Sequence, residues 1–266
     1  MSRLSDVFAR CKAEKRAALV GYLTAGDPDI ETSKALLLML AGQVDVLEIG
    51  MPFSDPMADG PVIQAASERA LASNTHIKDV FALAQCVRDA NPELGIVLMG
   101  YANTPFVLGF DCFSEQAAKA GVDAVLLVDI PPEEGHICDA IFKKYGLDRI
   151  LLLSPTSTEA RIKLASEHAS GFIYYVSLNG ITGAEMGEMT TIQQQVANIR
   201  KHTKLPICVG FGVKTPAQVA EVGAFSDGVV VGSHFVGHIP AYMNNIEDMQ
   251  TAMHAAAKNM KKAILT

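Results

Sequence analysis

The feature that most constrains the fold is an alternation between short apolar runs and stretches with a helical pattern. The runs are rich in β-branched and aliphatic residues and are nearly continuous, which is typical of strands buried on both faces. There are eight of them, at residues 17–24, 44–50, 95–100, 124–129, 149–154, 172–177, 206–211 and 228–233. Strands that alternate with helices are joined by crossovers, so these strands should lie parallel in one sheet.

Eight parallel strands in a chain of 266 residues match the size at which such a sheet closes into a (β/α)₈ barrel. The alternative is an open, doubly wound sheet, which predicts a G-x-G-x-x-G motif after the first strand and an acidic residue about 20 residues later. The first run instead ends in GYLTAGDPD at residues 21–29. We therefore predict the α/β class and a (β/α)₈ TIM barrel, formed as a single domain by residues 1–266.

Helices beyond the basic barrel are also predicted. Leu4, Val7, Phe8 and Cys11 recur at the spacing of one helix face, which indicates an extra N-terminal helix. Additional helices are predicted in the strand 2 connection, around 61–73, and in the strand 8 connection, at about 245–264. Helix starts are marked by an N-cap followed by proline at Asp27-Pro28 and Thr215-Pro216, and by the proline pair at 131–132.

Charge and cysteine content exclude several classes of function. The net charge of −7 disfavours a general nucleic-acid binder or a protein of anionic membrane surfaces. No apolar run approaches the roughly 18 residues of a membrane span, and the first 16 residues lack the apolar core of a signal peptide. The five cysteines are widely spread and form no C-x-x-C motif, which favours a reducing cytoplasm.

Glycines at the ends of the last strands indicate a phosphate site. Gly210-Phe211-Gly212 and Gly232-Ser233 close the seventh and eighth runs, where barrels most often bind phosphate. Glycine lets backbone N–H groups approach an anion closely, and the segment 179–183 would complete such a cradle. The competing interpretation is a set of ordinary tight turns.

Two acidic residues are candidates for acid–base chemistry. Glu48 shares a strand face with Val44 and Val46, and an ionised carboxylate there is costly unless it is paired or wetted. If that face lines the barrel, Glu48 enters the site with a raised pKa; otherwise it forms a structural ion pair. Asp59 lies in the proline-rich loop 52–61 and either folds back over the strand end or caps the next helix.

His234 and His238 have the i, i+4 spacing of metal ligands on a helix. No third ligand lies nearby in the sequence. We therefore predict no metal site.

The segment EIGMPFSDPMADGP at residues 48–61 resembles the signature of the tryptophan synthase alpha subunit family. Other pieces of the family pattern follow in the same order and extend the resemblance over nearly the whole chain. They are YLTAGDP (22–28), MGYAN (99–103), GVDAVLLVDIP (121–131), YYVSLNGITG (174–183), VGFGV (209–213) and VVGS (230–233).

The resemblance implies a carbon–carbon lyase that cleaves indole-3-glycerol phosphate to indole and glyceraldehyde 3-phosphate in a retro-aldol reaction. Glu48 would be the acid/base, Asp59 would hold the indole N–H, and Tyr174 would assist while Tyr175 faces the other way. The implied substrate and phosphate contacts are Tyr22, Met99, Leu126, Thr182, Gly183, Gly212, Gly232 and Ser233. One departure is His234, which stands where the family frequently has alanine.

The resemblance also implies a complex in which two alpha subunits flank a beta dimer and indole passes between the sites. Pyridoxal phosphate is expected only in the beta partner, and no cofactor is expected in this chain. The loops 52–60 and 178–190 would couple the subunits. The alternatives are a stand-alone indoleglycerol-phosphate lyase, a catalytically silent barrel that activates a partner, and another phosphate-binding barrel enzyme.

Overall fold

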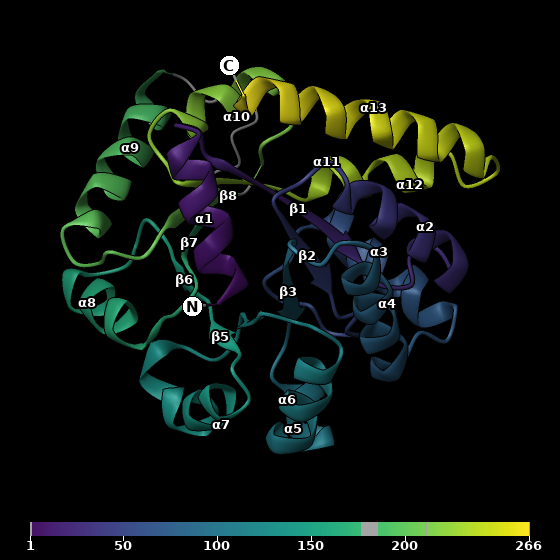
Figure 1. Cartoon of the computed structure of the whole chain (residues 1–266), viewed down its shortest axis with the longest axis horizontal. Coiled ribbons are helices and arrows are strands. Elements are labelled where there is room, and N and C mark those ends of the chain that lie inside the picture. Colours follow the sequence, from purple (N-terminus) through teal and green to yellow (C-terminus); the bar gives the residue numbers. More distant parts are fainter. Residues whose placement is uncertain (1, 177–185, 211, 266) are drawn as a thin grey trace.

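The computed structural model describes residues 2–176, 186–210 and 212–265. In the range 186–210, side chains are described from residue 189 onward. Within these residues, one sheet of nine parallel strands runs in the order β5-β4-β3-β2-β1-β9-β8-β7-β6 (Figure 1). The strands are β1 (Ala18–Thr24), β2 (Val46–Gly50), β3 (Gly95–Gly100), β4 (Ala124–Leu127), β5 (Asp148–Arg149), β6 (Leu151–Leu153), β7 (Ile173–Val176), β8 (Ile207–Gly210) and β9 (Gly228–Val231). The predicted TIM barrel is confirmed.

The two edges of the sheet are connected by the backbone of the fifth predicted strand, which closes the barrel. That run divides into β5 and β6, which are separated only by Ile150 and form the two ends of the sheet. β5 pairs with β4, and the N–H of Ile150 still donates to the carbonyl of Val125 at 3.0 Å. β6 then pairs with β7 on the other side. One continuous segment therefore joins the two edges.

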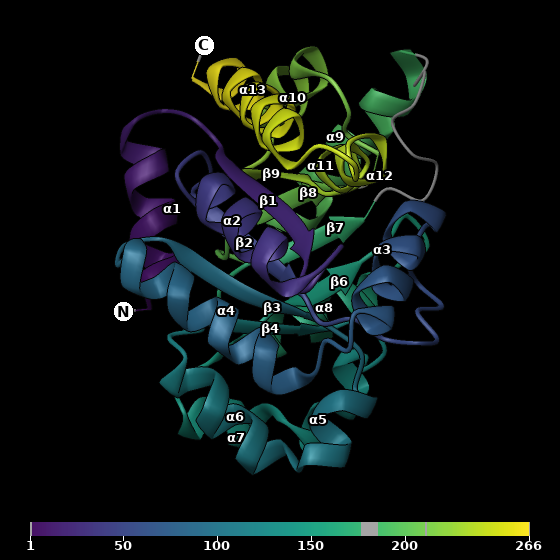
Figure 2. The same cartoon turned by 90° about the vertical axis from the view of Figure 1, so that its right-hand side faces the viewer.

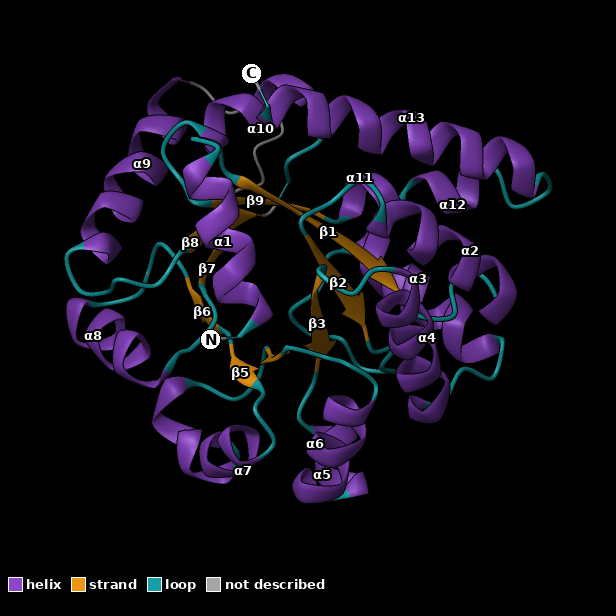
Figure 3. Cartoon of the chain, viewed as in Figure 1, coloured by secondary structure: helices purple, strands orange, loops and turns teal. Residues whose placement is uncertain are grey.

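Helices surround the strands as an outer ring (Figure 3). The helices of the described residues, including α1 over one end of the barrel, are α1 (Arg3–Ala13), α2 (Ile30–Ala41), α3 (Pro61–Ala72), α4 (Ile77–Ala90), α5 (Asn103–Leu108), α6 (Phe110–Lys119), the 3₁₀ helix η1 (Pro132–Ile137), α7 (Asp139–Lys144), α8 (Glu159–His168), α9 (Met186–Arg200), α10 (Pro216–Gly223), α11 (Ser233–Val236), α12 (His238–Ala241) and α13 (Ile246–Ile264). The additional helices predicted after strands 2 and 8 are therefore confirmed. Within the described ranges, no helix is both long and apolar enough to cross a membrane.

The predicted N-terminal helix is α1, and it covers the end of the barrel at which the strands begin (Figures 1 and 2). Its buried residues are the four predicted from their spacing, from Leu4 to Cys11. They pack with inward-facing strand residues such as Val20 and Val46. The opposite end, where the strands finish, is left for the connecting loops and α3.

One helix start differs from the sequence prediction. The N-cap of α2 is Asp29, whose side chain accepts from the N–H of Thr32, and not Asp27. Asp27 is instead buried in a two-bond ion pair with Arg69 of α3, at 2.7 and 2.8 Å. Asp27 therefore pairs with an arginine 42 positions away, a contact that the sequence around Asp27 does not reveal. Thr215 is confirmed as the N-cap of α10.

The strands separate an inner core from an outer one. Leu47 and Ile49 of β2 pack outward with the helices, whereas Val46 packs inside the barrel. Val44 lies with the outer core, because β2 begins only at Val46 and the alternation does not extend back to it. The face that carries Glu48 is therefore the one that lines the barrel.

Candidate active site

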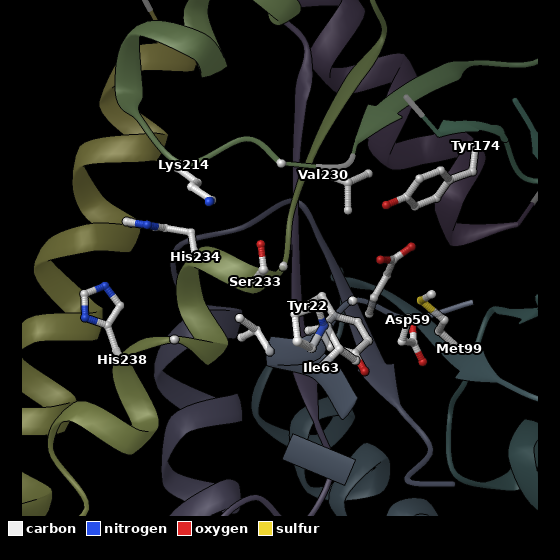
Figure 4. Close-up of a pocket in the computed structure, with 17 residues that line it drawn as sticks. Tyr22, Asp59, Ile63, Met99, Tyr174, Lys214, Val230, Ser233, His234 and His238 are labelled. Atoms are coloured by element: carbon white, nitrogen blue, oxygen red, sulfur yellow. The ribbon is translucent and has the colours of Figure 1, made fainter. Parts of the chain in front are cut away.

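A cavity of about 610 Å³ opens at the carboxyl ends of the strands (Figure 4). Its walls come from several strand ends, from the start of α3 and from the region of α11 and α12. The described lining residues are Tyr22, Glu48, Asp59, Gly60, Pro61, Val62, Ile63, Met99, Tyr174, Gly212, Lys214, Val230, Gly232, Ser233, His234, Gly237 and His238. This is the end of a TIM barrel at which active sites lie.

Glu48 projects from β2 into this cavity, in register with Tyr22 of β1. Its side chain is buried, with 1% of the residue exposed, and its Oε1 has no hydrogen-bond partner in the part of the chain that is described. Burial raises the pKa of Glu48 to about 8. Glu48 forms no ion pair among the described residues, so the alternative of a structural ion pair is not supported. Glu48 holds a proton at neutral pH.

Asp59 is brought to the same cavity by the loop after β2. The hydroxyl of Tyr101 donates to its Oδ2 at 3.0 Å and accepts from the N–H of Ala58 at 3.0 Å. The ring of Phe53 stacks on Tyr101, with 5.1 Å between centroids. Burial raises the pKa of Asp59, and the hydrogen bond from Tyr101 partly offsets this. Asp59 does not cap α3, whose N-cap is Gly60.

Tyr174 and Tyr22 line the same cavity as Glu48. Burial, together with the nearby Glu48, raises the pKa of Tyr174 well above its usual value, so its hydroxyl stays protonated. A Cβ at Gly210 would lie 2.5 Å from that hydroxyl, and a Cβ at Gly50 would overlap the hydroxyl of Tyr22. Glycine at these two strand ends therefore makes room for the tyrosines.

Tyr175, the neighbour of Tyr174, packs in the outer core, so the predicted opposite orientation of the two tyrosines is confirmed. Met99 lines the cavity as expected. Leu126 is fully buried in the inner core and is not among the lining residues that the structure describes. Thr182 and Gly183 lie outside the described residues.

The expected phosphate contacts Gly212, Gly232 and Ser233 line the cavity, and Figure 4 shows Ser233 on the side away from Asp59. Sequence reasoning missed three basic residues there, Lys214, His234 and His238. The two histidines had been weighed only as metal ligands. No group of three metal-binding side chains occurs in the described ranges. The sequence does contain a signal for two of them, because they lie close to predicted phosphate contacts: Lys214 is two residues after Gly212, and His234 directly follows Ser233.

Comparison with known proteins gives a consistent result. A family model described as tryptophan synthase alpha chain matches residues 8–265. The tryptophan synthase alpha chain of Zymomonas mobilis is 46% identical over 265 residues, which cover 99% of this chain and 97% of that protein. The one from Nitrosococcus oceani is also 46% identical, with 99% and 98% covered.

Solved structures agree. The crystal structure of tryptophan synthase subunit alpha from Legionella pneumophila is similar with a TM-score of 0.92 and 40% identity, covering 99% of this chain and 98% of that one. A chain of Mycobacterium tuberculosis tryptophan synthase gives a TM-score of 0.91 and 33% identity, with 100% and 99% covered. With its barrel, its buried glutamate and these relatives in agreement, the chain belongs to the tryptophan synthase alpha chain family.

Proposed function

We propose that this chain cleaves indole-3-glycerol phosphate to indole and glyceraldehyde 3-phosphate, with Glu48 as the group that moves the proton. The family is one of lyases that act on this substrate. The observation that carries the proposal is a glutamic acid that is buried, unpaired at Oε1 within the described structure, and directed into the cavity. A pKa of about 8 leaves it protonated but close enough to neutrality to exchange its proton.

The reaction needs one net proton transfer. Protonated Glu48 donates to C3 of the indole ring, the carbon that bears the glyceryl chain, and positive charge develops on the ring nitrogen. Asp59 accepts the N–H hydrogen bond and stabilises that charge. The Glu48 carboxylate then takes the proton of the glyceryl hydroxyl next to C3. As the new carbonyl forms, the carbon–carbon bond breaks and its electron pair restores the aromatic ring, so Glu48 ends the cycle protonated.

Other lining residues hold the substrate in this proposal. Tyr22 and Met99 contact the indole and glyceryl parts, and Tyr174 keeps a neutral hydroxyl beside Glu48. Gly212, Gly232 and Ser233 bind the phosphate through their backbone and hydroxyl groups. The roles of Leu126, Thr182 and Gly183 stay predictions from the resemblance.

Replacing Tyr101 with phenylalanine is expected to lower kcat/KM about tenfold. The substitution removes the donor to Asp59 and the acceptor for the N–H of Ala58, while the ring that stacks on Phe53 is kept. Steady-state kinetics of indole release measures the effect. Tyr145, whose exposed hydroxyl bonds Asp111 far from the cavity, offers the matched control Tyr145→Phe. Equal kinetics for Tyr101→Phe and the native chain would show that Asp59 does not need this positioning.

The chain is further proposed to assemble with a tryptophan synthase beta subunit in an α₂β₂ complex, with pyridoxal phosphate held only by that partner. Large apolar side chains support a docking surface near the site. Met57 is 79% exposed, and Phe106 and Val107 of α5 are 73% and 77% exposed. The loop of Met57 and α5 both adjoin Tyr101. Exposed apolar groups of this size are typical of surfaces that a partner covers.

A cytoplasmic location is proposed as well. All five cysteines are free thiols, as in proteins of reducing compartments.

The experiment that tests the function is indole release from indole-3-glycerol phosphate by the purified chain, with and without a beta subunit. We expect slow turnover alone and a strong rise when the beta subunit is added. Fast turnover that the beta subunit leaves unchanged would point to a stand-alone lyase. An absence of turnover under both conditions would reject the lyase assignment.

A further inference from the structure

The end of the cavity away from Asp59 carries basic side chains from two separate parts of the chain. Lys214 follows β8, whereas His234 and His238 lie on α11 and α12 after β9 (Figure 4). The two imidazole rings meet edge to face, with 5.2 Å between centroids. All three side chains line the same cavity as Ser233. The contact between β8 and β9 brings the two segments together.

This basic group has no acidic ion-pair partner among the residues that the structure describes. Neither Lys214 nor His234 forms an ion pair with an acid of the described segments, and Nε2 of His238 is buried there without a hydrogen-bond partner. The groups that act on His234 are His238 and Lys214, and Tyr242 stacks beside His238. The other titratable groups of the cavity are Tyr22, Glu48, Asp59 and Tyr174.

Burial and the neighbouring basic groups favour the neutral form of His234. Burial lowers its pKa first, and His238 and Lys214 lower it further. Burial also lowers the pKa of His238. A buried polar atom without a partner, such as Nε2 of His238, is costly, so a ligand that brings negative charge gains from binding beside these basic groups.

We propose that Lys214 and His234 bind the phosphate of the substrate through their side chains, with His234 taking up a proton as the phosphate arrives. The inference rests on the proposed function for the identity of the ligand as a phosphate monoester. The proposal adds two charged side chains, one of which changes its protonation state, to a phosphate subsite otherwise built from backbone groups. His238, in contact with His234, helps to keep that imidazole neutral until the anion is present.

A definite pH dependence follows. A phosphate monoester has its second pKa near about 6 and is largely a dianion at pH 7. A cradle of backbone N–H groups alone would bind it more tightly as pH rises through that value. If protonated His234 binds the phosphate, affinity instead decreases with rising pH, because the imidazolium loses its proton. Affinity for the phosphate ester should therefore fall between about pH 7 and pH 8.5.

Calorimetric titration with two probes tests the proposal. Indole-3-propanol phosphate lacks the hydroxyls that cleavage requires, and indole-3-propanol is the matched ligand without phosphate. Titrations in buffers of different ionisation enthalpy should show uptake of up to about one proton with the ester and none with the alcohol. Lys214→Ala and His234→Gln should each weaken ester binding about tenfold and leave alcohol binding unchanged. His234→Gln should also abolish proton uptake.

Matched controls are Lys258→Ala and His254→Ala, which remove exposed basic groups of α13 and should change neither quantity. Lys214 is itself exposed, so its variant is expected to fold normally even if His234→Gln does not. Inorganic phosphate should compete with the ester.

Native ester affinity in Lys214→Ala, or native proton uptake in His234→Gln, would overturn the proposal. Simultaneous binding of inorganic phosphate and the ester would overturn it as well, because the anion would then have another site. The enzymatic function is judged separately. A chain that cleaves substrate but takes up no proton rejects only the inference, whereas one that takes up the proton but does not cleave rejects only the function.

Discussion

Turnover of indole-3-glycerol phosphate is expected to fall about 10³-fold when Glu48 is replaced by glutamine, while binding of indole-3-propanol phosphate changes little. Glutamine has nearly the same shape as the protonated acid and leaves the cavity intact. It can neither donate a proton to C3 nor accept one from the glyceryl hydroxyl. The measurement is single-turnover indole release, with calorimetric binding of the ester as the second readout.

The control is Glu68→Gln, which neutralises an exposed glutamate on α3 close to the site in sequence but outside the cavity lining described above. It should retain native turnover. Substantial turnover in Glu48→Gln would remove Glu48 from the mechanism. Loss of ester binding together with turnover would mean that Glu48 acts in binding rather than in proton transfer.

Much of the barrel could be predicted because each strand is a local signal. A buried strand of a parallel sheet is apolar on both faces, so it appears as a short continuous run whatever its neighbours are. The division at Ile150 is different in kind. The break arises because β5, at Asp148–Arg149, pairs with β4, while β6, at Leu151–Leu153, pairs with β7. Pairing partners lie far away in the sequence and leave no mark inside the run.

The same distinction applies to the site. The alternation within β2 predicted that Glu48 shares a face with Val46, because the two residues are two positions apart, and the structure shows that this face lines the barrel. The bond from Tyr101 to Asp59 joins residues 42 positions apart, and the partner of Asp27 is equally remote. The basic group formed by Lys214, His234 and His238 was not predicted, because Lys214 follows a different strand end from the two histidines.

The burial that prepares Glu48 for catalysis should also make the stability of the native chain depend on pH. Its pKa is about 8 in the folded protein against an ordinary value of 4.5, so between these pH values the folded state holds a proton that the unfolded state has lost. The free energy of unfolding should therefore fall as pH rises through this window, by up to about 1.4 kcal/mol per pH unit. The loss should level off above pH 8.

Glu48→Gln removes this contribution, so urea unfolding of the variant and the native chain at pH 5 to 9 should give curves that diverge as pH rises. Glu68→Gln should follow the native chain throughout. A constant difference between native and Glu48→Gln would mean that Glu48 ionises with an ordinary pKa in the fold. Such a residue would already be a carboxylate at neutral pH and could not begin the reaction by protonating C3. The stability measurement thus tests the first chemical step without any substrate present.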